Sequence, residues 1–185
     1  MTWLFLKERK LLRPGIRILH VAPETCLREK LKALPDVAYV AGDKHEPGYT
    51  YPEGTIDLDI TKIQFPADHF DLILCSHVLE HVPDDAAAMR ELHRVLAPGG
   101  TAILMVPVDM RNARTEEDLL ITDPKERLRR YGQFDHVRLY GRDYMERLQR
   151  AGFTVIEDAM TERMEPEAVF KAGLLRSEVV HAGTK

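Results

Sequence analysis

The sequence predicts an α/β fold with a parallel sheet, and residues 70–107 carry the main evidence. Phe70–Cys75 is a short apolar run, typical of a strand that is buried on both faces. Apolar residues recur at helical spacing between Ala86 and Leu96, and Thr101–Val106 is a second apolar run. A strand–helix–strand unit of this length is a right-handed crossover between parallel strands.

The ends of the helix in this unit are marked by residues with known positional preferences. Pro83, Asp84 and Asp85 precede it, and acidic residues in a first turn oppose the positive end of the helix dipole. Pro98, Gly99 and Gly100 follow it and stop the helix. The boundaries of the unit are therefore set by local chemistry.

The remaining elements alternate in the same way. Residues 1–15 predict an N-terminal helix, ended by Pro14 and Gly15. Further strands are expected at Ile16–Val21, Val37–Gly42, Ile56–Ile60, Phe153–Glu157 and Val179–His181. Further helices are expected at Leu27–Leu34, Thr115–Leu120, Pro124–Tyr131 and Gly141–Ala151.

Length and composition restrict the classes of protein that are possible. A chain of 185 residues with 30% charged and 44% hydrophobic residues suits one globular domain, spanning residues 1–185. The net charge of −4 gives no reason to expect nucleic acid or an anionic membrane as a partner. Cys26 and Cys75 lack metal-binding spacing, so we expect two reduced, largely buried thiols in a cytoplasmic protein.

The carboxyl ends of the strands are where an open parallel sheet binds its ligand. Asp43 follows the second strand, where a carboxylate can accept both ribose hydroxyls of an adenosine. His77 and His81 form the spacing HxxEH, which in zinc proteases needs one face of a long helix. A buried strand precedes these histidines and Pro83 follows them, so we expect no metal.

Two segments of the chain resemble a known family. The turn at residues 77–82, HVLEHV, and the turn at residues 94–100, RVLAPGG, are similar to those of class I S-adenosylmethionine-dependent methyltransferases. The resemblance implies a Rossmann-like, doubly wound sheet of seven mostly parallel strands in the order 3-2-1-4-5-7-6. It also implies S-adenosylmethionine as the cofactor.

The first loop departs from the pattern of this family. Family members end the first strand with an acidic residue and a glycine-rich loop, where this chain has His20, Ala22, Glu24 and Cys26. Either the loop takes another backbone course, with Glu24 receiving the methionine ammonium and His20 behind it, or cofactor binding is lost. We favour the first alternative because other cofactor positions match.

Those other positions are implied by the resemblance. Asp43 would hold the ribose, and Asp59 would contact the adenine amino group, with Ile60 packed on the adenine face. Ser76 would flank the methionine portion. His77, at the end of the fourth strand, is the candidate to touch the reacting group.

The irregular stretch at residues 109–140 is longer than a minimal connection and predicts a lid that builds the acceptor pocket. A neutral His136 braced by Asp135 could act as a general base near pH 7. The alternative is a solvated loop with a local salt bridge.

We therefore expect methyl transfer to a small-molecule acceptor whose reacting atom the sequence leaves open. The alternatives are a non-catalytic or regulatory nucleotide-binding protein and an enzyme that uses the cofactor, or a different nucleotide, for another reaction. The chain has no basic groove with aromatic platforms for nucleic acid and no membrane span. The short C-terminal end could leave a sheet edge for a homodimer.

Overall fold

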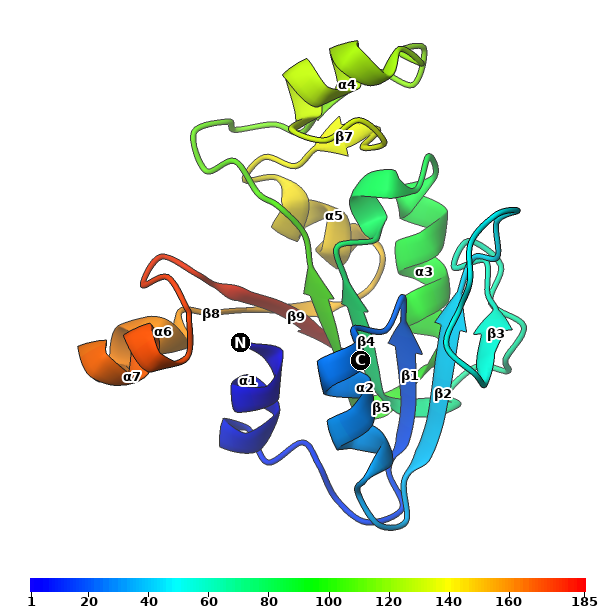
Figure 1. Cartoon of the computed structure of the whole chain (residues 1–185), viewed down its shortest axis with the longest axis vertical. Coiled ribbons are helices and arrows are strands. Elements are labelled where there is room, and N and C mark those ends of the chain that lie inside the picture. Colours follow the sequence, from blue (N-terminus) through cyan, green and yellow to red (C-terminus); the bar gives the residue numbers. More distant parts are fainter.

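The computed structural model describes residues 1–185 and contains a seven-stranded sheet in the order β3-β2-β1-β4-β5-β9-β8 (Figure 1). The strands are β1 (Arg17–Val21), β2 (Ala38–Asp43), β3 (Thr55–Asp57), β4 (Phe70–Ser76), β5 (Leu96–Met105), β8 (Thr154–Asp158) and β9 (Val180–Thr184). The pairs from β3 to β5 are parallel, and β9 pairs antiparallel with both β5 and β8. The predicted fold class and strand order are confirmed.

Helices cover both faces of the sheet. They are α1 (Thr2–Glu8), α2 (Thr25–Lys32), α3 (Asp85–Val95), α4 (Pro124–Tyr131), α5 (Tyr144–Arg150), α6 (Met160–Arg163) and α7 (Pro166–Lys171), with a short 3₁₀ helix η1 (Leu79–His81) after β4. Asp84 caps α3 by accepting a hydrogen bond from the backbone N–H of Ala87 at 2.9 Å. The helix thus begins at the acidic residues expected at its start.

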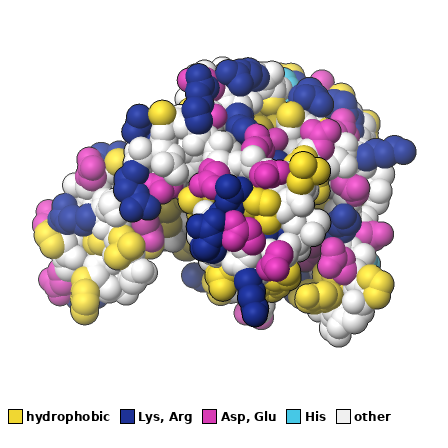
Figure 2. Space-filling model, turned by 90° about the horizontal axis from the view of Figure 1, so that it is seen from above, with side chains coloured by type: hydrophobic (Ala, Val, Ile, Leu, Met, Phe, Trp, Pro, Cys, Tyr) yellow, Lys and Arg dark blue, Asp and Glu magenta, His cyan; other side chains and the backbone are white.

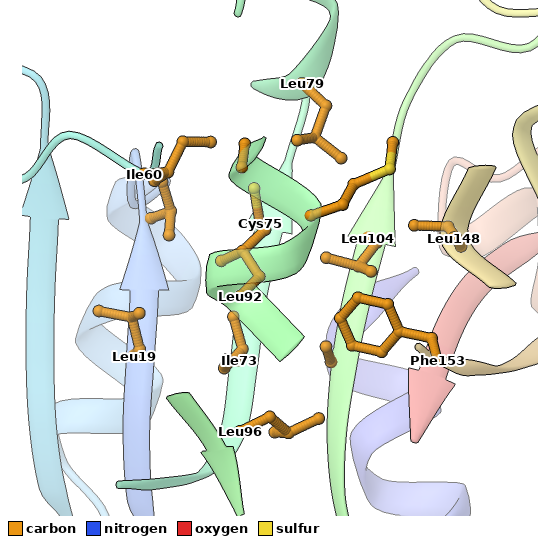
Figure 3. Packing of buried hydrophobic residues seen from close by; sticks show 14 of the residues in the cluster. Leu19, Ile60, Ile73, Cys75, Leu79, Leu92, Leu96, Leu104, Leu148 and Phe153 are labelled. Carbon is orange, nitrogen blue, oxygen red and sulfur yellow. The ribbon is translucent and has the colours of Figure 1, made fainter. Parts of the chain in front are cut away.

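Alternation of side chains along the strands produces a hydrophobic core on each face. Leu19 and Ile73 pack with α3 and α5 in one cluster, while their neighbours Ile18 and Leu72 pack with α1 and α2 in the other. Figure 3 shows the first cluster, with Ile60 and Leu79 at its upper end. The segments that follow the carboxyl ends of the strands are therefore packed directly against the hydrophobic core.

Some sequence-based expectations are wrong. No helix forms at residues 115–120; instead β6 (Glu116–Glu117) pairs antiparallel with β7 (Arg138–Leu139), because Thr115 is held by the carboxylate of Asp143. Cys26 is exposed, since it lies on the solvent side of α2, whereas Cys75 is buried as expected. The N-terminal helix ends at Glu8, well short of residue 15.

The segment between β5 and α5 extends beyond the carboxyl ends of the parallel strands. Figure 1 shows α4 and β7 above the arrowheads of β1 and β4. The segment returns beside β5 through a bridge between Val108 and Tyr140. No helix of the chain is long and apolar enough to cross a membrane.

Candidate active site

The carboxyl ends of β1, β2, β3 and β4 surround a cavity of about 600 Å³, a size that suits a small-molecule ligand. Its lining comprises Val21, Ala22, Asp43, Lys44, Glu46, Tyr49, Tyr51, Leu58, Asp59, Ile60, Thr61, His77, Val78, His81, Val82, Pro83, Asp84 and Asp135. Basic and acidic side chains are interspersed over this end of the molecule (Figure 2). Of the predicted site residues, five line the cavity: Ala22, Asp43, Asp59, Ile60 and His77.

The loop after β1 makes a tight turn without glycine. Ala22 has φ +45°, a left-handed conformation that L-residues with a Cβ seldom adopt. Its N–H donates to the carbonyl of Gly42 at 2.8 Å, which keeps the loop against β2. The backbone therefore bends sharply at the cavity wall with the small methyl group of alanine where the family has glycine.

This strain yields a stability prediction. We expect Ala22→Gly to stabilise the fold by roughly 0.5–1 kcal/mol, because relief of the left-handed conformation exceeds the added entropy of the unfolded chain. The matched control is Ala33→Gly at the end of α2, where φ is −78° and the change should destabilise instead. Urea denaturation gives the change in the free energy of unfolding for each variant. A change of the same sign in Ala22→Gly and Ala33→Gly would contradict the prediction.

His20 and Glu24 form a hydrogen-bonded pair behind this loop. The Nε2 of the buried His20 lies 2.8 Å from Oε2 of Glu24, and its Nδ1 lies 2.9 Å from the hydroxyl of Tyr39. Burial acts to raise the pKa of Glu24, but the hydrogen bond with His20 holds that pKa below its ordinary value. Glu24 is thus an ionised carboxylate, oriented from behind, although neither residue lines the cavity.

Asp43 and Asp59 lie on the same side of the cavity. Asp43 ends β2 and its Oδ1 accepts from the N–H of Lys44 at 2.8 Å, while partial burial raises its pKa. Asp59 follows β3, and its Oδ1 accepts hydrogen bonds from the hydroxyl and N–H of Thr61, which lower its pKa. Two fixed carboxylates therefore face one cavity beside the apolar side chain of Ile60.

A glycine is required for this geometry at one position. A Cβ on Gly42 would lie 2.5 Å from Cδ2 of Leu58. The close approach lets the chain pack Leu58 against β2 and so fixes the adjoining Asp59. Any larger residue at position 42 would push these two segments apart.

His77 occupies the opposite side of the cavity. It follows Ser76 at the end of β4, has φ +56°, and exposes 63% of its side chain. Its Nδ1 lies 3.5 Å from Oε1 of Glu80, and interaction with this carboxylate raises the pKa of His77. Ser76 itself does not line the cavity.

His136 lies behind this wall of the cavity. It is buried, its Nδ1 lies 3.1 Å from the carbonyl oxygen of Tyr131, and its ring meets that of His81 edge to face at 4.7 Å. Burial, together with the nearby His81, lowers the pKa of His136. Asp135 lines the cavity instead, and its Oδ2 is 3.4 Å from Nδ1 of His81 rather than being paired with His136.

The segment 109–140 is tied to η1 by specific hydrogen bonds. The N–H of Val137 donates to the carbonyl of Glu80 at 2.9 Å. The guanidinium of Arg138, only 1% exposed, donates to the carbonyls of Leu79, Val82 and Pro83. The turn that carries Glu80 and His81 is therefore held from above by side chains that follow it far along the sequence.

Sequence reasoning missed several residues of the site. The cavity wall includes residues that it did not assign, among them Lys44, Glu46, Tyr49, Tyr51, Thr61 and Val82. It also missed the role of Glu80 and Arg138, whose only signals were the HxxEH spacing and the polar string before residue 140. Neither signal indicates a role by itself, because the role depends on the contact between η1 and the segment around Arg138.

A family model described as a methyltransferase domain matches residues 13–158 of the chain. The chain belongs to the class I S-adenosylmethionine-dependent methyltransferase family. The match covers every strand from β1 to β8, including the loop that lacks glycine. The loop after β1 thus lies inside the matched range.

Solved methyltransferase structures have the same fold. An S-adenosylmethionine-dependent methyltransferase from Mesorhizobium loti is 21% identical with a TM-score of 0.58, covering 98% of this chain and 96% of that one. One from Archaeoglobus fulgidus is 12% identical with a TM-score of 0.62, covering 100% and 93%. At these identities the likeness concerns the fold.

Among curated proteins, a 2-methyl-6-phytyl-1,4-hydroquinone methyltransferase from Oryza sativa subsp. japonica is 30% identical over 114 residues. That match covers 60% of this chain and 29% of the rice protein. A ubiquinone biosynthesis O-methyltransferase from Pseudomonas aeruginosa is 49% identical over 35 residues, 19% of this chain and 15% of that protein. The chain thus spans less than a third of the length of either relative.

Proposed function

We propose that this methyltransferase-family protein transfers a methyl group from S-adenosylmethionine to a small-molecule acceptor. The observation that carries the proposal is the cavity in which Asp43 and Asp59 face Ala22 and His77 across the carboxyl ends of four strands. The names of two relatives, which mention a hydroquinone and O-methylation, support a small-molecule acceptor.

The residues present fit the cofactor. The Oδ1 of Asp43 accepts from Lys44, which leaves Oδ2 for ribose hydroxyls. Asp59 would accept from the adenine amino group while Ile60 packs on the ring. The sharp turn at Ala22 provides the close backbone approach for which relatives use glycine.

S-adenosylmethionine, when bound, supplies a methyl group that is already activated by its sulfonium. In the transfer, the nucleophilic atom of the acceptor forms a bond with the methyl carbon, while the carbon–sulfur bond breaks and its electron pair stays on sulfur. The protein contributes alignment of these atoms and exclusion of water. The exposed imidazole of His77, at the cavity wall, is placed to take the proton that the acceptor loses.

We assign the segment 109–140 as the lid of the acceptor side. Support comes from Asp135, which lines the cavity, and from the hydrogen bond between Val137 and Glu80. His136 as a general base stays a prediction, because it would need His81 to move before it met an acceptor. Cytoplasmic location and a homodimer likewise stay predictions.

Calorimetric titration of the stripped protein with S-adenosylmethionine and S-adenosylhomocysteine tests the proposal. We expect both to bind, and Asp43→Asn to weaken each about tenfold, or ~1.4 kcal/mol, through loss of a charged acceptor. Asp36→Asn, an exposed position on the loop before β2, should leave both affinities unchanged. If the folded protein binds neither ligand, the proposal is wrong, and a non-catalytic role or another ligand is favoured.

A further inference from the structure

Three potential metal ligands converge at the acceptor side of the cavity. Glu80 and His81 come from η1, and His136 comes from the loop before β7. Each offers one ligand atom, and these atoms all lie within 4.8 Å of one another. We propose that Glu80, His81 and His136 bind a divalent transition-metal ion. The role argued for this ion rests on the proposed methyl transfer.

Glu80 is the strongest reason for the proposal. The residue is 1% exposed, and neither carboxylate oxygen has a hydrogen-bond partner. The nearest cationic candidate, Nδ1 of His77, lies 3.5 Å from Oε1, which is long for a hydrogen bond. Burial of a carboxylate costs several kcal/mol unless it is paired or coordinates a metal. A bound cation would supply the missing partner.

His136 is already oriented as metal ligands usually are, and His81 has a carboxylate close to its ring. A ligating histidine commonly donates its second ring N–H to a carbonyl or a carboxylate, which fixes the tautomer. Nδ1 of His136 lies 3.1 Å from the carbonyl oxygen of Tyr131, and Nδ1 of His81 lies 3.4 Å from Oδ2 of Asp135. The contact with Tyr131 leaves Nε2 of His136 available for the ion, and the ring of His81 can present either nitrogen.

The set of two imidazoles and one carboxylate identifies the class of metal. It occurs in catalytic zinc sites and in non-haem iron sites, both of which keep open positions for water or substrate. Around zinc these atoms would lie roughly 3.3 Å apart, given bond lengths of about 2.1 Å. The set can close by movement of His81, whose side chain is 31% exposed, toward the buried pair.

This site differs from the zinc-protease interpretation of HxxEH that the sequence raised and rejected. His77 has φ +56° and is not one of the three ligands, although its Nδ1 lies 3.5 Å from Oε1 of Glu80. The second histidine of the set is His136, from far along the chain. The prediction that the chain holds no metal assumed that ligands would come from one helix. The structure supplies them from two segments.

The position of the ion gives it a role in the proposed reaction. His81 and Asp135 line the cavity, so an open coordination position would face the acceptor. A metal-bound hydroxyl loses its proton more readily, because the cation stabilises the oxygen anion. The oxygen releases its proton to solvent or to His77 and forms the bond to the methyl carbon, and the carbon–sulfur electron pair stays on sulfur. The acceptor class is therefore a small hydroxyl compound.

Metal binding is measured on the full chain after treatment with a chelator, by calorimetry with Zn²⁺, Mn²⁺ and Mg²⁺ in turn. We expect one Zn²⁺ per chain, with Mg²⁺ binding weakest because two ligands are imidazoles. Glu80→Gln and His81→Gln should each weaken Zn²⁺ binding at least tenfold. The control His69→Gln, at the opposite end of β4, should leave the affinity unchanged.

The outcomes separate this proposal from the methyltransferase proposal. S-adenosylhomocysteine is titrated into the same variants, and its affinity should not change by more than about twofold in Glu80→Gln. Zn²⁺ bound equally by wild type and both ligand variants, or lost equally in His69→Gln, would overturn the metal site. Metal binding without S-adenosylhomocysteine binding would support the metal site and contradict the proposed function alone.

Discussion

Replacement of Arg138 by methionine is expected to destabilise the protein by about 3–5 kcal/mol, the typical cost of removing one partner from a buried ionic network. Arg138 is 1% exposed and donates to three carbonyls of the η1 region, those of Leu79, Val82 and Pro83. Its Nε also donates to Glu117 at 2.9 Å. Methionine fills most of the space but removes all the hydrogen bonds that the guanidinium donates.

The neighbouring Arg147 limits the loss without abolishing it. It donates to Asp85 at 2.8 Å and also bonds Glu117, so the carboxylates of the network keep one cation. The Leu79 carbonyl keeps the Tyr140 hydroxyl as a donor at 3.3 Å, but the carbonyls of Val82 and Pro83 lose the guanidinium, and their desolvation dominates the expected cost. Urea denaturation should show a lower midpoint with an unchanged slope.

The matched control for this prediction is Arg129→Met on α4. Arg129 is exposed and pairs with Glu126 within the same helix, so its replacement should cost less than about 0.5 kcal/mol. If the two variants lost a similar free energy of unfolding, the buried hydrogen bonds of Arg138 would contribute no more to stability than an exposed ion pair does. Because η1 carries Glu80 and His81, the Arg138 variant should also bind Zn²⁺ less tightly, at temperatures where it remains folded.

The fold could be predicted because its signals are local. Apolar runs such as Phe70–Cys75 indicate strands buried on two faces, and the structure divides Leu72 and Ile73 between the two cores as alternation requires. The segment 109–140 could not be predicted in the same way. Thr115 begins no helix because its partner, Asp143, lies 28 residues away, and helix propensity contains no such information.

The residues of the candidate site likewise fall into those that the sequence could indicate and those whose surroundings depend on long-range contacts. Asp43 could be located from the end of the second strand and Asp59 through the resemblance to the family, and both line the cavity. The surroundings of Glu80 and His136 could not, because their burial results from the packing of α4 and β7 onto η1. The pattern HxxEH pairs His77 with His81, whereas in the structure the histidine that lies beside Glu80 and His81 in the three-residue group is His136.

A second large effect is expected at the first loop. Glu24→Gln should weaken the binding of S-adenosylmethionine about 30-fold, or ~2 kcal/mol, through loss of a charge-assisted contact with the methionine ammonium. The carboxylate is 46% exposed and is oriented by His20 at 2.8 Å. Glutamine preserves the shape and one acceptor oxygen but removes the charge that attracts the ammonium.

The choice of ligand makes this test specific. 5′-Methylthioadenosine carries the nucleoside but no ammonium, so Glu24→Gln should leave its affinity within about twofold of wild type. Glu29→Gln, on the exposed face of α2, is the matched control and should change neither affinity. An equal loss for both ligands would instead mean that Glu24 supports the loop through its hydrogen bond with His20 and does not contact the ammonium.

The pH dependence of binding follows from the lowered pKa of Glu24. A carboxylate whose pKa is depressed stays charged above that value and loses its charge only as the pH falls through it. The ordinary value is 4.5, so the ammonium contact should persist from pH 7 down to about pH 5. In His20→Phe the hydrogen bond that lowers the pKa is gone, and burial alone would raise it. Binding of S-adenosylmethionine by this variant should therefore weaken at a higher pH than in wild type, while 5′-methylthioadenosine shows no such shift.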